Sequence, residues 1–256
     1  MDVEGKAALI TGGGTGVGRA TALALARRGC AVAVNYSRSR DEAEQTAADA
    51  IALGVRAVAL VADVADATQA GTLVARAVAE LDAPLAVLVN SAGTTSFIPH
   101  GDLERVGDDD WDRILAVNLK GPFHCARAAR SALEAAGGEI VNVSSIAGLA
   151  GIGSSIPYCA SKAALNNLTI TLARALAPRI RVNAVAPGFI TGRWLEGGLG
   201  AAYEATKAFV EQRVPLHRVC EPEDVAAAIV GLVTGSDLVT GQILTIDGGM
   251  LIAGLG

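Results

Sequence analysis

Short, continuously apolar segments alternate along this chain with longer segments in which apolar residues recur at helical spacing. The apolar segments lie at residues 7–10, 30–35, 57–61, 85–90, 139–144, 181–186 and 242–246, and the helical patterns at 19–28, 41–53, 67–81, 109–133, 158–177 and 222–233. Strands without polar alternation are typical of a parallel sheet covered by helices on both faces. Because crossovers between parallel strands are right-handed, this order predicts an α/β fold with a doubly wound, Rossmann-like sheet of about seven strands.

The domain organisation follows from what separates these segments. No linker rich in proline, glycine or serine divides the sequence, so we expect a single domain over residues 1–256. One stretch, residues 191–215, departs from the alternation, because several glycines precede a helical pattern there. Glycine-rich segments of this kind often move over a ligand, and we interpret this stretch as a substrate lid.

Composition excludes several classes of protein. Of the 256 residues, 51% are hydrophobic and 18% are charged, which excludes a disordered chain. The net charge of -5 argues against nucleic acid as a partner. No apolar run approaches the roughly 18 to 20 residues of a membrane helix, and no signal peptide is recognisable at the first residues. The four cysteines are scattered, with no histidines at ligand spacing. We therefore expect a cytoplasmic protein without a membrane or metal site.

The first predicted strand runs into a glycine-rich turn, Thr11 to Gly18, which reads T-G-x-x-x-G-x-G. A strand, a glycine turn and a helix in succession offer backbone N–H groups and the positive end of a helix to a pyrophosphate. The spacing does not fit G-x-G-x-x-G, because Arg19 stands where that pattern needs its third glycine. A tight connection without any ligand is the alternative interpretation of this motif taken alone.

Tyr158 and Lys162 are four residues apart in a predicted helix and therefore share one face. A tyrosine with its ordinary pKa of about 10 is a poor acid or base at neutral pH. One ammonium about 4 Å away, at an effective dielectric of about 20, supplies roughly the 3 to 4 kcal/mol needed to lower that pKa by two to three units. Ser145 follows a predicted strand and offers a hydroxyl to a substrate carbonyl, with Ser144 as the neighbouring alternative. An exposed helix face with ordinary strand-end hydroxyls remains the simpler interpretation.

Several further motifs occur in a fixed order with these residues. The matching segments are Thr11 to Gly18, Asp63-Val64, Asn90-Ser91-Ala92-Gly93, Val117 to Gly121, Ser145 thirteen residues before Tyr158, Tyr158 to Lys162, Pro187-Gly188 with Thr191, and Gly241 to Gly249. Over essentially its whole length, the chain resembles the short-chain dehydrogenase/reductase family. One departure is mild: Ser91 stands where the family more commonly has asparagine.

The resemblance implies a role for each catalytic position. Tyr158 would be the general acid in reduction and the general base in oxidation, and Lys162 would lower its pKa and hold the nicotinamide ribose. Ser145 would orient the substrate oxygen, and Asn118 would support a proton-carrying water chain behind Lys162. Family members are usually tetramers that pair two long helices, which here correspond to residues 118–133 and 158–177, so a homotetramer is expected.

The resemblance also implies a binding groove for a nicotinamide dinucleotide. Asp63 would contact the adenine, and the loop that begins at Pro187 would hold the nicotinamide carboxamide. The complete set of expected cofactor-binding residues is Gly12, Thr15, Gly16, Val17, Gly18, Ser37, Arg38, Asp63, Val64, Asn90, Ala92, Gly93, Tyr158, Lys162, Pro187, Gly188, Ile190 and Thr191.

The loop after the second strand favours NADP(H) over NAD(H). An NAD-dependent enzyme needs a carboxylate there for the ribose 2′-hydroxyl, and none occurs before Asp41. Arg38 and Ser37 fit a 2′-phosphate instead, because guanidinium groups bind phosphate well. Thr15 argues the other way, because it stands where many NADP-dependent members carry an arginine. An ordinary solvated loop is the alternative interpretation of Arg38 and Arg40.

These observations predict an oxidoreductase that moves a hydride between NADP(H) and a carbonyl or secondary alcohol of a small molecule. The 3-oxoacyl-(acyl-carrier-protein) reductase type resembles the chain most, and an NAD-dependent dehydrogenase of a sugar, steroid or small hydroxy-ketone is the alternative. An epimerase or dehydratase would carry a larger C-terminal part, and a non-catalytic cofactor-binding protein would not need the intact serine, tyrosine and lysine. Phe189 and Trp194 either line the substrate pocket or pack the lid onto the domain.

Overall fold

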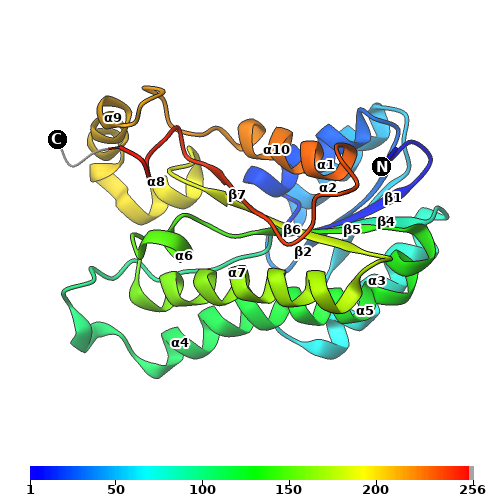
Figure 1. The fold of residues 1–256 in the computed structure, drawn as a ribbon, viewed down its shortest axis with the longest axis horizontal. Helices are drawn as coiled ribbons and strands as arrows, with labels where there is room; N and C mark the ends of the chain where they lie inside the picture. Colours follow the sequence, from blue (N-terminus) through cyan, green and yellow to red (C-terminus); the bar gives the residue numbers. More distant parts are fainter. Residues whose placement is uncertain (254–256) are drawn as a thin grey trace.

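The computed structural model describes residues 1–253, and its centre is one parallel β-sheet (Figure 1). The seven strands run in the order β3-β2-β1-β4-β5-β6-β7. Their bounds are β1 (Ala7–Thr11), β2 (Ala31–Tyr36), β3 (Ala57–Val61), β4 (Leu85–Asn90), β5 (Glu139–Val143), β6 (Arg181–Pro187) and β7 (Ile243–Ile246). The predicted α/β fold with a doubly wound, Rossmann-like sheet is confirmed.

Helices cover both faces of this sheet, as Figure 1 shows. The helices α1, α2 and α10 lie on one face, and α3, α5 and α7 lie on the other. Their bounds are α1 (Gly16–Ala26), α2 (Arg40–Ala52), α3 (Ala67–Leu81), α4 (Asp108–Leu115), α5 (Gly121–Ala136), α6 (Ala147–Ala150), α7 (Ile156–Leu176), α8 (Arg193–Leu199), α9 (Tyr203–Arg213) and α10 (Pro222–Thr234).

The central strands are buried on both faces, which explains why they lack polar alternation. All five residues of β1 are buried, and their side chains alternate between two hydrophobic clusters. Ala7 and Leu9 belong to the cluster under α3, α5 and α7, whereas Ala8 and Ile10 belong to the cluster under α1, α2 and α10. Each cluster removes a large apolar area from water, and this burial stabilises the three layers.

The prediction of a single helix over residues 109–133 is wrong, because a π-helical turn, η2 (Ala116–Lys120), separates α4 from α5. Pro122 gives the physical reason. It has no N–H to donate to the carbonyl of Asn118, four residues earlier, and its ring would collide with that carbonyl in a regular α-helix. A wider turn relieves the collision, and turns of this kind frequently occur at functional sites.

The segment predicted as a lid contains two helices and stands at the end of the molecule where the strands finish (Figure 1). It begins at Gly192, whose backbone has φ of 122° and ψ of 176°, a conformation that is open essentially to glycine alone. The short helix α8 follows at once, and α9 then leads the chain back toward α10. Phe189 packs against Tyr203 of α9, with ring centroids 5.8 Å apart, and so fastens the base of the lid to the domain.

Candidate active site

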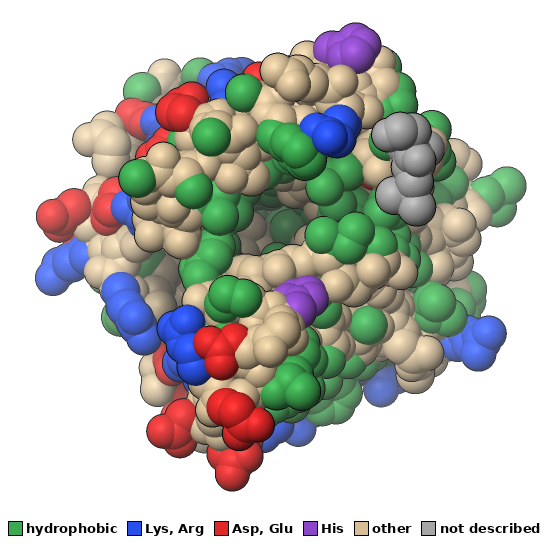
Figure 2. Space-filling model, turned by 90° about the vertical axis from the view of Figure 1, so that its left-hand side faces the viewer, with side chains coloured by type: hydrophobic (Ala, Val, Ile, Leu, Met, Phe, Trp, Pro, Cys, Tyr) green, Lys and Arg blue, Asp and Glu red, His purple; other side chains and the backbone are tan. Residues whose placement is uncertain are grey.

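The carboxyl ends of β1, β4, β5 and β6 meet at one edge of the sheet. The chain order reverses between β1 and β4, and doubly wound sheets bind their ligands at such a reversal. Figure 2 shows this end of the molecule hollowed, with hydrophobic side chains around much of the opening. The residues expected to bind substrate and cofactor are therefore brought to one edge of the sheet.

The glycine turn leaves space and free donors where a phosphate would lie. Gly16 has φ of 50°, and an added Cβ there would have no neighbour within 4 Å. Thr15 precedes α1 without capping it through its side chain, so the first N–H groups of that helix keep their hydrogen-bonding capacity. Gly18 is needed for packing instead, because a Cβ there would lie 2.3 Å from the carbonyl oxygen of Gly12.

The turn is tied to the segment after β4. The Thr11 hydroxyl accepts hydrogen bonds from the backbone N–H groups of Ser91 and Ala92, at 3.0 and 3.1 Å. Asn90 is buried and donates to Asn142 on the neighbouring strand at 2.8 Å. Its Oδ1 atom has no hydrogen-bond partner among the described residues, although it is buried. An orphaned acceptor of this kind is expected where a ligand completes the site.

Tyr158 and Lys162 project from α7 beneath the end of β5. The Ser155 hydroxyl caps α7 by accepting from the Tyr158 N–H at 3.4 Å. The Lys162 ammonium lies 5.7 Å from the centroid of the Tyr158 ring and donates to the carbonyl of Val143 at 2.7 Å. The structure thus brings together the phenol and the amine that the spacing predicts.

The pKa values of this pair differ from the expectation. Burial raises the pKa of Tyr158 to about 12, while the hydroxyl of Ser145 acts in the opposite direction. Burial also lowers the pKa of Lys162 to about 8. The predicted lowering of the tyrosine pKa by the lysine is therefore wrong. The reason is that the amine points to a backbone carbonyl and loss of solvent dominates both groups.

The two neighbouring serines have different surroundings. The Ser144 side chain is buried and donates to Asn166 at 2.6 Å. Ser145 is half-buried, and its hydroxyl is the hydrogen-bonding neighbour that opposes the rise in the pKa of Tyr158. It also accepts from the Ala147 N–H at 3.1 Å. Of the two, Ser145 is the hydroxyl next to the phenol.

Asn118 lies in the π-helical turn and is almost completely buried. Its amide accepts from the Thr94 N–H at 2.8 Å and donates to the Thr94 carbonyl at 2.9 Å. It also donates to the hydroxyl of Ser161, at 3.0 Å. The side chain thereby joins the segment after β4 to α7, one turn away from Tyr158.

The loop after β6 passes the same edge. Pro187 accepts from the backbone of Ile146, and Gly188 packs so tightly on Asp247 that a Cβ would lie 2.9 Å from the aspartate's own Cβ. Ile190 pairs with Cys220, and the Thr191 hydroxyl donates to Glu221. These contacts fix the start of the lid beside β7.

The segment predicted as a lid rests on the segment after β4 at two points. Trp194 of α8 lies within 3.7 Å of where a Cβ of Gly93 would be, and Phe97 lies directly against Gly198. Trp194 is 44% exposed where it lies against Gly93, whereas Phe189 packs against Tyr203. The sequence left both aromatic residues with two roles, and the structure favours the packing role for Phe189.

The expected ribose-binding loop lies after β2. Ser37 and Arg38 are exposed there, and Asp63 is exposed after the neighbouring β3, where it accepts from the Ala65 N–H at 2.9 Å. Val64 is buried against Gly121 of α5. Sequence reasoning missed a further residue, Arg193, which reaches this loop from the lid; no periodicity or motif signals a contact between segments so distant along the chain.

Comparison with known proteins assigns the family. A family model described as Enoyl-(Acyl carrier protein) reductase matches residues 12–251. The 3-oxoacyl-(acyl-carrier-protein) reductase FabG of Staphylococcus aureus is 38% identical over 248 residues, which cover 96% of this chain and 98% of that protein. The chain belongs to the short-chain dehydrogenase/reductase family. It is an NAD(P)-dependent oxidoreductase.

Three further proteins are similar to the chain over nearly its whole length. A protein designated ketoacyl reductase 2 of the granaticin polyketide synthase from Streptomyces violaceoruber is 43% identical, with 96% of each chain covered. Among solved structures, a blue fluorescent protein from a metagenomic library, in complex with NADPH, has a TM-score of 0.87 at 34% identity, covering 98% of this chain and 99% of that one. An NAD⁺-bound xylitol dehydrogenase also has a TM-score of 0.87, at 30% identity, with 97% and 100% covered.

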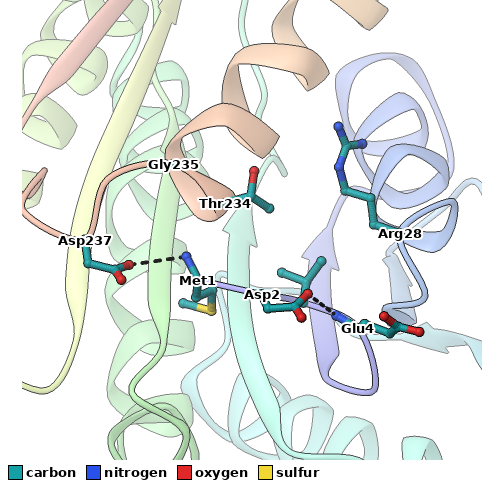
Figure 3. A pocket seen from close by; sticks show the side chains of 8 residues that line it. Met1, Asp2, Glu4, Arg28, Thr234, Gly235 and Asp237 are labelled. Atoms are coloured by element: carbon teal, nitrogen blue, oxygen red, sulfur yellow. Dashed lines mark hydrogen bonds and ion pairs between the residues drawn. The ribbon is translucent and has the colours of Figure 1, made fainter.

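Elsewhere within residues 1–253, the largest feature to consider as a second site is a surface depression. A depression of about 600 Å³ lies beside the N-terminus (Figure 3), at the end of the sheet opposite the hollow. Its wall is a structural contact, because the terminal ammonium donates to Val233 at 2.8 Å and to Asp237 at 3.3 Å. Within residues 1–253, no group of three His, Cys, Asp or Glu side chains could hold a metal ion. In the same range, no helix is long and apolar enough to cross a membrane.

Proposed function

We propose that this enzyme uses NADPH to reduce the ketone of a 3-oxoacyl thioester to a secondary alcohol. The observation that carries the proposal is the adjacency of two hydroxyl groups, Ser145 and Tyr158, at the edge of the sheet where the glycine turn opens. Two hydroxyl donors side by side suit an oxygen that gains negative charge during reduction.

The free backbone donors at Gly16 and the orphaned Asn90 acceptor fit a bound nicotinamide dinucleotide. When bound, that cofactor supplies the hydride. Ser145 donates a hydrogen bond to the substrate ketone and holds it against Tyr158. The high pKa of Tyr158 keeps the phenol protonated at neutral pH, which is the state that a general acid needs.

We assign Lys162 to the nicotinamide ribose. An ammonium has three N–H donors, so the Lys162 amine can donate to a ribose hydroxyl while it keeps its hydrogen bond to the carbonyl of Val143. Asn118, whose carbonyl receives no N–H from Pro122, is the residue that we assign to a water chain returning the proton.

The choice of NADPH rests on the loop after β2. Arg38 and Ser37 are exposed there, and the first carboxylate of α2, Asp41, lies beyond them. A guanidinium suits a dianionic phosphate, whereas NAD-dependent enzymes need a carboxylate for the 2′-hydroxyl. The FabG relative and the NADPH complex support this choice, while the NAD⁺-bound xylitol dehydrogenase represents the alternative.

Substrate class follows from the relatives and from the apolar border of the hollow in Figure 2. Two relatives bear ketoacyl reductase names, and an apolar border suits an acyl chain better than a sugar. The matching family model is described as an enoyl reductase, which reduces a carbon–carbon double bond. The ketoacyl reductase names of the two relatives favour the ketone over the double bond.

The test compares substrates and cofactors in one assay. We expect purified enzyme to oxidise NADPH with acetoacetyl thioesters and to leave crotonyl thioesters, xylulose and steroid ketones unreduced. Ser145→Ala should lower kcat by about 100-fold or more, as loss of one preorganised donor does. Ser144→Ala is the matched control, because that hydroxyl bonds Asn166 inside the protein. Turnover of crotonyl thioester alone would contradict the proposal.

The resemblance also leads us to propose a homotetramer that pairs α5 and α7 between subunits. Phe123 of α5 is 41% exposed, and the Arg127 guanidinium stacks 5.5 Å from its ring centroid. Such an exposed aromatic residue is typical of the centre of an interface. Light scattering on the purified enzyme should give four times the 25.8 kDa of one chain. Phe123→Asp should shift the mass toward a smaller species.

A further inference from the structure

Arg193, the first residue of α8, reaches from the lid across to the loop that follows β2. Its Nη1 atom lies 2.6 Å from Oε1 of Glu42, and its Nη2 donates to the Ser39 hydroxyl at 3.1 Å. Glu42 belongs to the first turn of α2, and Ser39 immediately precedes that helix. The lid is therefore tied to the cofactor-specificity loop by one side chain.

The loop that Arg193 contacts is the one expected to meet the adenosine ribose. Ser39 follows directly after Ser37 and Arg38, the residues proposed for the 2′-phosphate. Arg193 thus contacts the same short segment to which Arg38 belongs. Two guanidinium groups around one dianion are a stronger and more selective arrangement than one, because each can form paired N–H···O bonds.

The present partner of Arg193 is easily exchanged. The side chains of Arg193 and Glu42 are 57% and 43% exposed, and exposed ion pairs contribute little to stability. The hydrogen bond from Arg193 lowers the pKa of Glu42, so this side chain is a carboxylate at neutral pH. A carboxylate repels a phosphate placed beside it. Glu42 therefore competes with a 2′-phosphate for Arg193 and does not help to bind it.

We propose that Arg193 is a second ligand of the 2′-phosphate of NADP(H). It binds this phosphate after its ion pair with Glu42 has broken. This inference rests on the proposed use of NADPH. Trp194, the next residue, already lies over Gly93, so a phosphate held by Arg193 also holds the lid over the groove. Selection of NADP(H) over NAD(H) and closure of the lid then depend on one contact.

The test measures binding, not turnover, and uses the full-length enzyme. Titrations of NADP⁺ and NAD⁺ monitored by calorimetry should show that Arg193→Gln lowers the affinity for NADP⁺ about tenfold, as expected for a charge-assisted hydrogen-bond pair. Binding of NAD⁺ should change by less than about twofold. Arg193→Lys should recover part of the loss, because the charge remains while the planar fork is absent.

Two further variants sharpen the result. Glu42→Gln should increase the affinity for NADP⁺ about threefold and leave the affinity for NAD⁺ unchanged, since it removes the competing carboxylate. Arg76→Gln is the matched control, because Arg76 also forms an exposed ion pair, with Glu80, but on the distant helix α3. It should alter neither titration.

Three results would overturn the inference. Equal weakening of both dinucleotides by Arg193→Gln would place Arg193 at the shared pyrophosphate, and no weakening would leave it a surface ion pair only. If Glu42→Gln instead weakened the binding of NADP⁺, the Glu42 carboxylate, and not Arg193, would be the residue that contacts the ribose. The proposed function fails separately, because in that case wild-type enzyme binds neither dinucleotide or prefers NAD⁺.

Discussion

The two ends of the sheet both bury ionisable side chains, yet they satisfy them differently. At the amino end, Glu139 opens β5 opposite Arg181 of β6 and is completely buried. Arg181 forms an ion pair with it, and Asn183 donates to it at 2.9 Å. Arg181 further donates to the carbonyls of α10 and of Val239. Folding alone therefore supplies this carboxylate with an ion pair and a hydrogen bond, although burial still raises its pKa.

At the carboxyl end the same strand leads to groups that folding leaves incomplete. Lys162 is nearly buried, and its amine donates to the neutral carbonyl of Val143; no ion pair of Lys162 occurs within residues 1–253. Tyr158 loses water without a cation that lowers its pKa, and Oδ1 of Asn90 has no partner in the described chain. The comparison teaches that the amino end is built for stability and the carboxyl end for a ligand.

The strongest test of this comparison is Tyr158→Phe. Removal of a general acid costs about 100- to 10,000-fold, so we expect kcat to fall by about 1,000-fold or more while NADP⁺ binding and the free energy of unfolding stay close to wild type. NADPH oxidation, calorimetric titration and urea denaturation measure the three quantities. Tyr203→Phe is the control, because Tyr203 packs against Phe189 below the lid. Retained turnover in Tyr158→Phe would break the assignment.

The matching test at the amino end is Arg181→Met. It leaves Glu139 buried without its cation, and such a loss destabilises a protein by about 3 to 5 kcal/mol. Urea denaturation at pH 8 should show this decrease in the free energy of unfolding. Activity per folded molecule should remain, since the ion pair lies at the opposite end of the sheet. A variant of wild-type stability with lost activity would reverse the roles of the two ends.

Much of the fold could be predicted because the residues that mark a buried strand or a helix are close together in the sequence. The strands at 57–61 and 85–90 and the helix at 67–81 have the predicted bounds, since a buried strand needs an unbroken apolar run. Periodicity could not reveal the interruption within residues 109–133, because the spacing of apolar residues continues through the π-helical turn. Pro122 was the signal in the sequence, and its effect depends on the carbonyl that it meets.

The site was less predictable than the fold. Spacing placed Tyr158 and Lys162 on one face, but it could not give the direction of the amine or the burial that raises the pKa of the phenol. Arg193 escaped sequence reasoning altogether, because its partners lie in a segment that only tertiary packing brings near. Functional residues that belong to a sequence motif can be predicted from sequence, whereas a residue whose contacts depend on tertiary packing, such as Arg193, cannot.

A smaller effect at the amino end is the pH dependence of stability. Burial raises the pKa of Glu139 to about 7, above its ordinary value of 4.5. The unfolded chain therefore loses this proton first as pH rises, so the free energy of unfolding decreases between about pH 4.5 and 7. At about 1.4 kcal/mol per unit, the decrease is at most about 3.5 kcal/mol. Urea denaturation across this range should show it in wild type but not in Glu139→Gln, and parallel curves would contradict it.

The carboxyl end should show the opposite slope, which is the most discriminating detail of the comparison. Burial lowers the pKa of Lys162 from 10.5 to about 8, so its own contribution to the free energy of unfolding rises with pH above about 8. This contribution is about 2 kcal/mol by pH 10, while the raised pKa values of Tyr158, Cys30 and Cys125 act in the opposite direction. In urea denaturation between pH 8 and 10, the free energy of unfolding of Lys162→Met should therefore fall below the wild-type trend by this amount, whereas Lys207→Met, on the exposed helix α9, should follow wild type. An unchanged slope in Lys162→Met would mean that the amine is already solvated, and the contrast between the two ends would disappear.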